Sequence, residues 1–268
     1  MSTNTVLFAF GLTVIAGLAT GIGSLLALFT RSTNTKFLSA ALGFSAGVMI
    51  YVSFVEILPE ADNSLSLALG KGSGPWATFA AFIGGIILIA LIDRLVPAAE
   101  NPHEITKVEE LHQKAPKKKQ MMRTGLLTAM AIAIHNFPEG LATFVSAIQD
   151  PSLGVAITVA IAIHNIPEGI AVSAPVFFAT GDRKKAFWLS FLSGLAEPLG
   201  AIVGFLFLMR FVNDLVFGVL FAMVAGIMVF IALDELLPAA REYGEEHISI
   251  YGAIAGMIVM GVSLLLLN

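Results

Sequence analysis

The segment His164-Asn165-Ile166-Pro167-Glu168-Gly169 lies near the middle of an apolar run over residues 154–179. The same core recurs as His135-Asn136-Phe137-Pro138-Glu139-Gly140 in the apolar run over 124–148. Each run is long enough to cross the roughly 30 Å hydrocarbon layer of a bilayer as a helix. Because a polar side chain at that depth must face protein, water or an ion, the repeated core predicts a functional site inside the membrane.

The composition of the whole chain is that of a membrane protein. Of its 268 residues, 57% are hydrophobic and only 13% are charged, whereas soluble domains carry roughly 25% charged residues. We therefore predict a single all-α transmembrane domain over residues 1–268. Eight apolar runs of bilayer length are separated by proline, glycine, polar or charged clusters, and they cover 5–29, 38–59, 76–97, 124–148, 154–179, 186–209, 214–238 and 247–267.

The basic residues are distributed unequally between the loops. The sequence holds 15 Lys and Arg residues, and all except Lys71 and Arg210 lie in or beside the loops after the first, third, fifth and seventh runs. The positive-inside rule then places these loops in the cytoplasm and both termini outside, in the plasma membrane. The longest of them, residues 98–122, is expected to be a polar cytoplasmic linker. His103 and His112 within it are candidates for metal sensing.

A second repeat relates the two ends of the chain. Residues 46–59 and 225–238 both begin with Ala-Gly-x-Met and end with Glu-x-Leu-Pro, at an offset of 179, and Gly-Leu-Ala at 17–19 matches 194–196. The partners are five spans apart, so the two copies cross the membrane in opposite directions. This predicts an inverted repeat of spans 1–3 and 6–8, in a 3+2+3 arrangement with the two His-Asn-x-Pro-Glu-Gly helices between the copies. The alternative is that small residues recur wherever membrane helices pack closely.

The two central cores share one layout, in which Asn follows His and Glu lies four residues after the His. Residues four apart lie on one face of a helix, so each helix is expected to present its own His and Glu as a pair of ligands. Neutral imidazole and carboxylate suit zinc and neighbouring divalent ions, and the chain has no cysteine for a thiolate site. The candidate ligands from the two cores are His135, Asn136, Glu139, His164, Asn165 and Glu168.

A third carboxylate, Glu197, lies near the centre of the sixth run and is followed by Pro198. Three carboxylates at one depth repel one another unless a divalent cation neutralises them, so metal binding and proton release should be linked. A single buried Glu can also be a protonated structural group, and a single His a satisfied core residue. We favour metal binding because such groups occur on three spans.

Proline occurs inside both cores, at Pro138 and Pro167. Proline lacks an N–H and clashes with the preceding turn of a helix. We therefore expect each proline to free a backbone carbonyl, that of Ile134 or Ile163, and to kink its helix beside the ligands.

Four further acids lie near the ends of the second and seventh runs, namely Glu56, Glu60, Asp234 and Glu235. They could attract cations at the entrance and exit of a path through the protein. They could equally be acids that simply meet water at helix ends, and the sequence leaves both interpretations open.

At these residues the chain resembles the ZIP family of divalent-metal transporters, most closely its bacterial ZupT-type branch. The resemblance covers nearly the whole chain and rests on the paired cores and on the segment Ser193-Gly194-Leu195-Ala196-Glu197. It implies transport of zinc, and often iron, manganese, cobalt or cadmium, into the cytoplasm, with the metal as substrate and no catalytic cofactor. It also implies that the metal is bound at His135, Asn136, Glu139, His164, Glu168 and Glu197.

One position departs from part of that family. Some members carry an acidic residue where this chain has Asn165, and they are thought to hold two metals bridged by carboxylate. An amide cannot bridge two cations as a charged ligand does. The resemblance therefore implies one well-occupied ion and a looser second one.

Two other functions compete with transport. An intramembrane metal-dependent hydrolase would use similar ligands, although the sequence has no His-Glu-x-x-His element. A passive pore would conduct the same ions through a static path. As partners we expect divalent metal ions and the lipid bilayer and no nucleic acid, and the small-residue helix faces are compatible with a homodimer.

Overall fold

The computed structural model describes residues 2–29, 35–95, 118–208, 213–243 and 246–267, and it contains no strand within these ranges. The described chain forms eight helical rods, each of which overlaps one of the apolar runs. They are α1 (Thr3–Phe29), α2 with η1 and α3 (Thr35–Val52, Ser53–Ile57, Leu58–Leu69), α4 (Gly74–Leu95), α6 (Lys118–Gln149), α7 (Pro151–Thr180), α8 with α9 and η3 (Arg183–Gly194, Ala196–Val203, Gly204–Leu208), α10 with η4 and α11 (Asp214–Ile231, Ala232–Leu236, Leu237–Tyr243), and α12 (Glu246–Leu267).

Seven of the described rods are long and apolar enough to cross a membrane, and α6 is the one outside this set. This confirms the prediction of a multi-pass all-α membrane protein.

α6 has 32 residues, so it is about 48 Å long, more than the bilayer core requires. It begins at Lys118, within the segment 98–122 that the sequence predicted to be a loop, because lysine is a good helix former. His103 and His112 lie outside the described residues.

The second and seventh rods continue past the prolines at which the sequence predicted their ends. α3 extends beyond Pro59 to Leu69, and α11 extends beyond Pro238 to Tyr243. Each proline is the second residue after a π-helical turn, so its missing N–H falls where the hydrogen-bond pattern changes from π to α. The prolines therefore mark local changes in these helices and do not end them.

The helices before these prolines contain matching π-helical turns, η1 and η4. In η1 the N–H of Leu58 bonds the carbonyl of Ser53, and in η4 the N–H of Leu237 bonds the carbonyl of Ala232. Such turns hold one extra residue and are found most often at functional sites. Both repeated Glu-x-Leu-Pro motifs thus begin in a widened turn.

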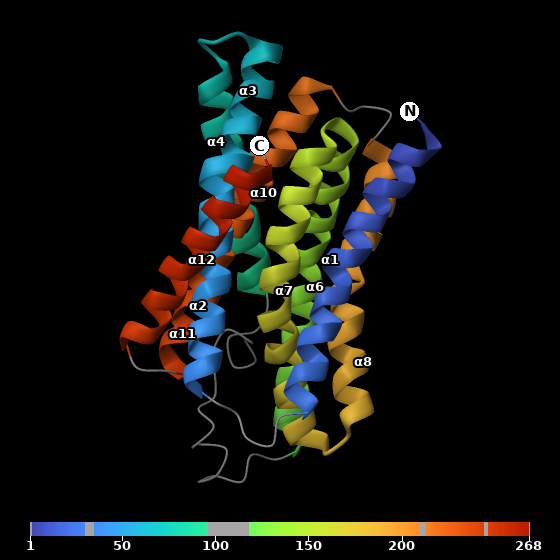
Figure 1. Ribbon diagram of the computed structural model, residues 1–268, viewed down its shortest axis with the longest axis vertical. Helices are drawn as coiled ribbons and strands as arrows, with labels where there is room; N and C mark the ends of the chain where they lie inside the picture. The colour runs from blue at the N-terminus through green and yellow to red at the C-terminus, as the bar shows by residue number, and fades with distance from the viewer. Residues whose placement is uncertain (1, 30–34, 96–117, 209–212, 244–245, 268) are drawn as a thin grey trace.

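The rods run along the long axis of the molecule, and α1 begins and α12 ends toward the same end of it (Figure 1). α1, α6, α7 and α8 lie on one side, while α2, α3, α4, α10 and α12 lie on the other. The main packing pairs are α1 with α7, α6 with α7 and α9, α2 with α12, and α10 with α4. α6 and α7 are neighbours in sequence and antiparallel, since a short turn at Asp150 connects them.

This turn is set by local chemistry. The Asp150 side chain accepts hydrogen bonds from the backbone N–H groups of Ser152 and Leu153 and so caps α7, whose first residue is Pro151. Asp at the N-cap and proline at the first helical position are both strong helix starts. The turn therefore fixes how the core of α6 is placed against the core of α7.

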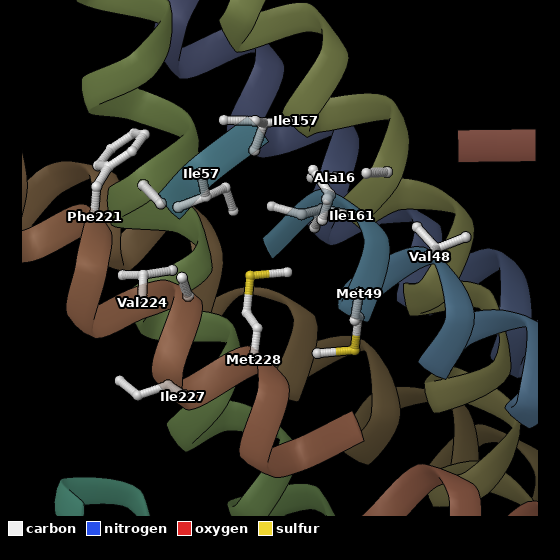
Figure 2. Packing of buried hydrophobic residues seen from close by; sticks show 14 of the residues in the cluster. Ala16, Val48, Met49, Ile57, Ile157, Ile161, Phe221, Val224, Ile227 and Met228 are labelled. Carbon is white, nitrogen blue, oxygen red and sulfur yellow. The ribbon is translucent and has the colours of Figure 1, made fainter. Parts of the chain in front are cut away.

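A buried apolar cluster connects the two sides of the molecule. Figure 2 shows Met49 of α2 and Met228 of α10 in this cluster, together with Ile57 of η1 and Ile161 of α7. Lipid is as apolar as these side chains, so the cluster is stabilised by close van der Waals packing more than by removal of water. It supports α7 one turn before His164.

Candidate metal site

All seven predicted ligands lie in the interior, and none has more than 2% of its surface exposed. α6 contributes one core and α7 the other, and the third carboxylate comes from α9. The helix is interrupted at Leu195, because Pro198 has no N–H to bond the Gly194 carbonyl. This interruption places Glu197 in the first turn of α9.

The closest contacts between imidazole and carboxylate are made between the two helices. His135 Nε2 lies 3.4 Å from Glu168 Oε2, and His164 Nε2 lies 3.2 Å from Glu139 Oε2. The spacing argument had expected pairs within each helix, but the one such contact in the described residues, His164 Nε2 to Glu168 Oε1, is longer at 4.0 Å. The antiparallel packing of α6 on α7 sets each His opposite the Glu of its neighbour.

These separations fit ligands of a single ion. Two donor atoms bound to tetrahedral zinc at its usual bond lengths are about 3.3 Å apart. The two short contacts are close to this value. Even so, no group of three or more His, Asp or Glu side chains in the described residues is already assembled around one point as a metal site. Binding of one ion by both pairs would therefore require side-chain movements that bring the pairs together.

The two Asn side chains use their nitrogens to hold neighbouring helices. Asn136 Nδ2 donates to the Ser193 carbonyl at 3.4 Å, and Asn165 Nδ2 donates to the Ala16 carbonyl at 3.0 Å and also to Glu197 Oε1. With the nitrogens engaged, each amide oxygen is left as an acceptor. Both oxygens are buried and neither has a hydrogen-bond partner in the described chain.

The site is rich in buried oxygens without donors. Within the described ranges, six such atoms belong to the predicted ligands: Asn136 Oδ1, Glu139 Oε1, Asn165 Oδ1, both carboxylate oxygens of Glu168, and Glu197 Oε2. Buried acceptors without partners are costly, and carboxylates most of all. Three carboxylates and two amide oxygens gathered in this way form an environment that a divalent cation would stabilise.

One imidazole has hydrogen-bond contacts at both ring nitrogens. His164 Nδ1 lies 3.1 Å from the Ala160 carbonyl. A carbonyl can only accept, so Nδ1 donates in this hydrogen bond, and Nε2 is the ring nitrogen that faces the carboxylates, 3.2 Å from Glu139 Oε2. Metal-bound histidines in proteins are oriented by hydrogen bonds of this kind.

The prolines of the two cores do not end their helices, and the kinks and freed carbonyls expected beside them stay predictions. α6 and α7 are continuous α-helices through Pro138 and Pro167. The breaks fall in other rods, at the π turns and at Leu195. Ser45 Oγ of α2 donates to the His164 carbonyl at 3.5 Å, next to the Ile163 carbonyl that Pro167 leaves without its helical N–H donor.

Acids near the helix ends interact electrostatically with other ionisable groups. Glu56 and Glu60 lie close enough to Asp150 for the carboxylates to repel one another, and Glu235 acts electrostatically on His135. Asp150 was not among the candidates from the sequence, because it lies in a turn and only the tertiary structure places it near Glu56.

A buried hydroxyl on α1 was also missed. Thr20 is fully buried, and its Oγ1 has no hydrogen-bond partner among the described residues. Thr20 could have been found from the sequence, since it lies 177 positions before Glu197, the offset that also relates Gly17 to Gly194.

The fold and site together define a multi-pass helical membrane protein with a buried nitrogen and oxygen site suited to a divalent cation. The family model described as ZIP zinc transporter matches residues 95–264. Curated proteins named "Zinc transporter ZupT" match nearly the full chain. The protein from Lysinibacillus sphaericus is 63% identical over 266 residues, covering 98% of this chain and 99% of the relative. Those from Streptococcus mutans and Clostridium perfringens are 64% and 59% identical, covering 96% and 98% of this chain and 97% of each relative.

The chain therefore belongs to the ZIP family, in its ZupT branch. This confirms the resemblance seen in the paired cores. The members of this family are transporters and not enzymes, so the hydrolase interpretation is set aside.

Proposed function

We propose that this protein transports zinc across the plasma membrane into the cytoplasm through a midplane site formed by the seven buried ligands of α6, α7 and α9. The observation that carries the proposal is the set of six buried oxygens without donors beside two imidazole Nε2 atoms. Zinc is the substrate of this site and not a catalytic cofactor. The same nitrogen and oxygen donors suit iron, manganese, cobalt and cadmium, which we propose as further substrates.

The eight rods are proposed to be eight membrane spans in a 3+2+3 arrangement, with α6 as the fourth. Supporting this, the π turns η1 and η4 occur at the offset of 179 seen in the sequence. The helices also pack reciprocally. Gly47 of α2 faces the Ala253 carbonyl of α12, and Gly226 of α10 faces the Phe82 carbonyl of α4. The second span thus packs on the eighth as the seventh packs on the third.

A mutual contact near the centre supports the same symmetry. A Cβ atom on Gly17 of α1 would lie 2.5 Å from the Gly194 carbonyl oxygen of α8, and a Cβ on Gly194 would lie 2.5 Å from the Gly17 oxygen. Such reciprocity is expected where two copies meet across a pseudo-two-fold axis. Inverted repeats in transporters place the substrate near the midplane and permit alternating access.

The orientation is proposed from charge. The exposed residues Arg94, Arg183, Lys184, Lys185 and Arg241 lie at ends of α4, α8 and α11 that face away from the end where α1 begins. The positive-inside rule places these ends in the cytoplasm and the termini outside. Arg210 and residues 96–117 lie outside the described residues. The homodimer stays a prediction.

The experiment is zinc uptake into proteoliposomes that contain the purified full chain. A carrier gives saturable uptake that requires the protein, whereas a passive pore gives flux that rises with concentration without saturation. Because metal and protons compete for imidazole and carboxylate, we expect lower uptake at pH 5.5 than at pH 7.5. Absence of protein-dependent zinc uptake at both pH values would refute the proposal, and the same assay with iron, manganese, cobalt and cadmium ranks the other substrates.

A further inference from the structure

Thr20 on α1 corresponds in position to Glu197 on α9. The two residues are 177 positions apart, the offset that also relates Gly17 to Gly194. Their backbones make equivalent contacts with the central helices, since the Thr20 carbonyl lies against Gly169 and the Glu197 carbonyl lies against Gly140. Each of these glycines ends one of the two cores. α1 therefore packs on the core of α7 as α9 packs on the core of α6.

The Asn side chains follow the same relation. Asn165 donates to the Ala16 carbonyl and Asn136 to the Ser193 carbonyl, and these two acceptors are again 177 positions apart. One contact of Asn165 has no charged counterpart at Asn136. Asn165 also donates to the carboxylate of Glu197, but the residue that the symmetry sets beside Asn136 is the uncharged Thr20.

This neutral side of the site has two acceptors without donors. Thr20 Oγ1 and Asn136 Oδ1 are both buried, and neither has a hydrogen-bond partner in the described part of the chain. Both side chains lie against the same short segment of α8. Thr20 Oγ1 is 3.0 Å from the position that a Cβ on Gly194 would take, and Asn136 Nδ2 is 3.4 Å from the carbonyl of the adjacent Ser193.

We propose that Thr20 Oγ1 and Asn136 Oδ1 form a second, uncharged subsite that binds one water molecule of the hydration shell of the transported ion. A metal-bound water has two protons to donate, and the subsite offers two neutral acceptors. This inference rests on the proposed transport of zinc through the site. It gives the ion three carboxylates as ligands on one side and a water-mediated contact on the other, in which Asn136 Oδ1 acts through the water and not as a direct ligand.

The lack of charge at Thr20 has a physical reason. Glu139, Glu168 and Glu197 already exceed the charge of one divalent ion, so a fourth carboxylate would repel the others unless a second cation entered. A hydroxyl contributes a hydrogen bond without that repulsion. Thr20 thereby helps the site to hold a single ion that can leave again.

The test is zinc binding to the purified full chain, measured by equilibrium dialysis. Thr20→Val removes the hydroxyl at nearly constant volume, and we expect zinc affinity to fall about 3- to 10-fold, the value of one hydrogen bond to a bound water. Thr20→Ser restores the hydroxyl and should restore affinity. The matched control is Thr13→Val on the same helix, because Thr13 is also buried but its hydroxyl bonds the Phe10 carbonyl of its own helix. Unchanged affinity in Thr20→Val, or an equal loss in Thr13→Val, would overturn the proposal.

Three further measurements complete the test. Thr20→Glu should raise the bound zinc by about one equivalent per chain, because a fourth carboxylate calls for a second cation; an unchanged ratio overturns the proposal even if Thr20→Val does not fold. A lower melting temperature of metal-free Thr20→Val would also overturn it, by assigning Thr20 to packing.

If Glu168→Gln binds zinc like the wild type, the proposed function itself is wrong. If Glu168→Gln loses zinc while Thr20→Val does not, only this subsite is wrong.

Discussion

The central helices α6 and α7 and the flanking helices α2 and α10 each carry a repeated motif, but they bury it in opposite ways. In α6 and α7 the repeat brings His, Asn and Glu side chains inside and leaves several of their oxygens without donors in the described chain. In α2 and α10 the repeat brings Met49 and Met228 into a closely packed apolar cluster (Figure 2). A repeat whose side chains satisfy one another is explained by packing, whereas one that leaves buried oxygens without donors calls for another explanation, which the proposed ion provides.

The largest expected effect is that of Glu168→Gln in the central pair. Removing even a group that only orients a metal ligand costs about 10- to 100-fold in affinity, so loss of a charged ligand should lower zinc uptake by about 100-fold or more. Uptake into proteoliposomes measures this. The control from the flanking rods is Asp62→Asn, which keeps the oxygen that accepts the 3.0 Å hydrogen bond from Thr78. Equal losses in both variants would break the contrast between the two regions.

Met228→Ala tests the flanking pair. Met228 is 1% exposed, and truncating a buried Met to Ala costs about 2–5 kcal/mol of stability. We expect a lower unfolding temperature in detergent, with zinc affinity changed by less than about threefold in the protein that remains folded, since no metal ligand is altered. The control is Leu233→Ala on the lipid-facing surface, where the side chain is 55% exposed. Loss of zinc affinity without loss of stability would contradict the assignment of this pair to packing.

Asn165→Asp sharpens the contrast within the central pair. The amide nitrogen of Asn165 donates to the Ala16 carbonyl and to Glu197, so an Asp there would face two acceptors without a donor. We expect the zinc-free variant to be less stable by about 1–3 kcal/mol, zinc to restore that stability, and metal analysis to find a second bound ion. An unchanged metal content would argue against a second ion at this position.

The smallest expected effect is at Ser45, which connects the two regions. Its hydroxyl donates from α2 to the His164 carbonyl at 3.5 Å, near the limit for a hydrogen bond. Ser45→Ala should lower stability by at most about 1 kcal/mol and change zinc uptake by less than about twofold. A large loss of uptake would mean that the flanking helix controls the orientation of His164, and the separation of the two regions would then be less complete.

The rods, the buried residues and the helix ends show which features could be predicted from the sequence. The eight helical rods follow from apolar runs of bilayer length, and the burial of all seven proposed ligands follows from their place inside those runs. The ends of two rods were predicted wrongly at Pro59 and Pro238, since a π turn before each proline lets the helix continue. Pattern reasoning treats proline as a stop because it considers one helix at a time.

Residue types and their spacing along single helices can be read from the chain alone. They establish a membrane protein and the family, and they predict the chemistry of the ligands. Only the tertiary structure decided which donor meets which acceptor: that His135 lies beside Glu168 and not beside Glu139, and that Asn165 donates to the Ala16 carbonyl. The reason is physical, since helical periodicity determines the face of one helix, whereas the register between helices depends on backbone contacts between residues far apart in sequence, such as that of Gly169 with Thr20.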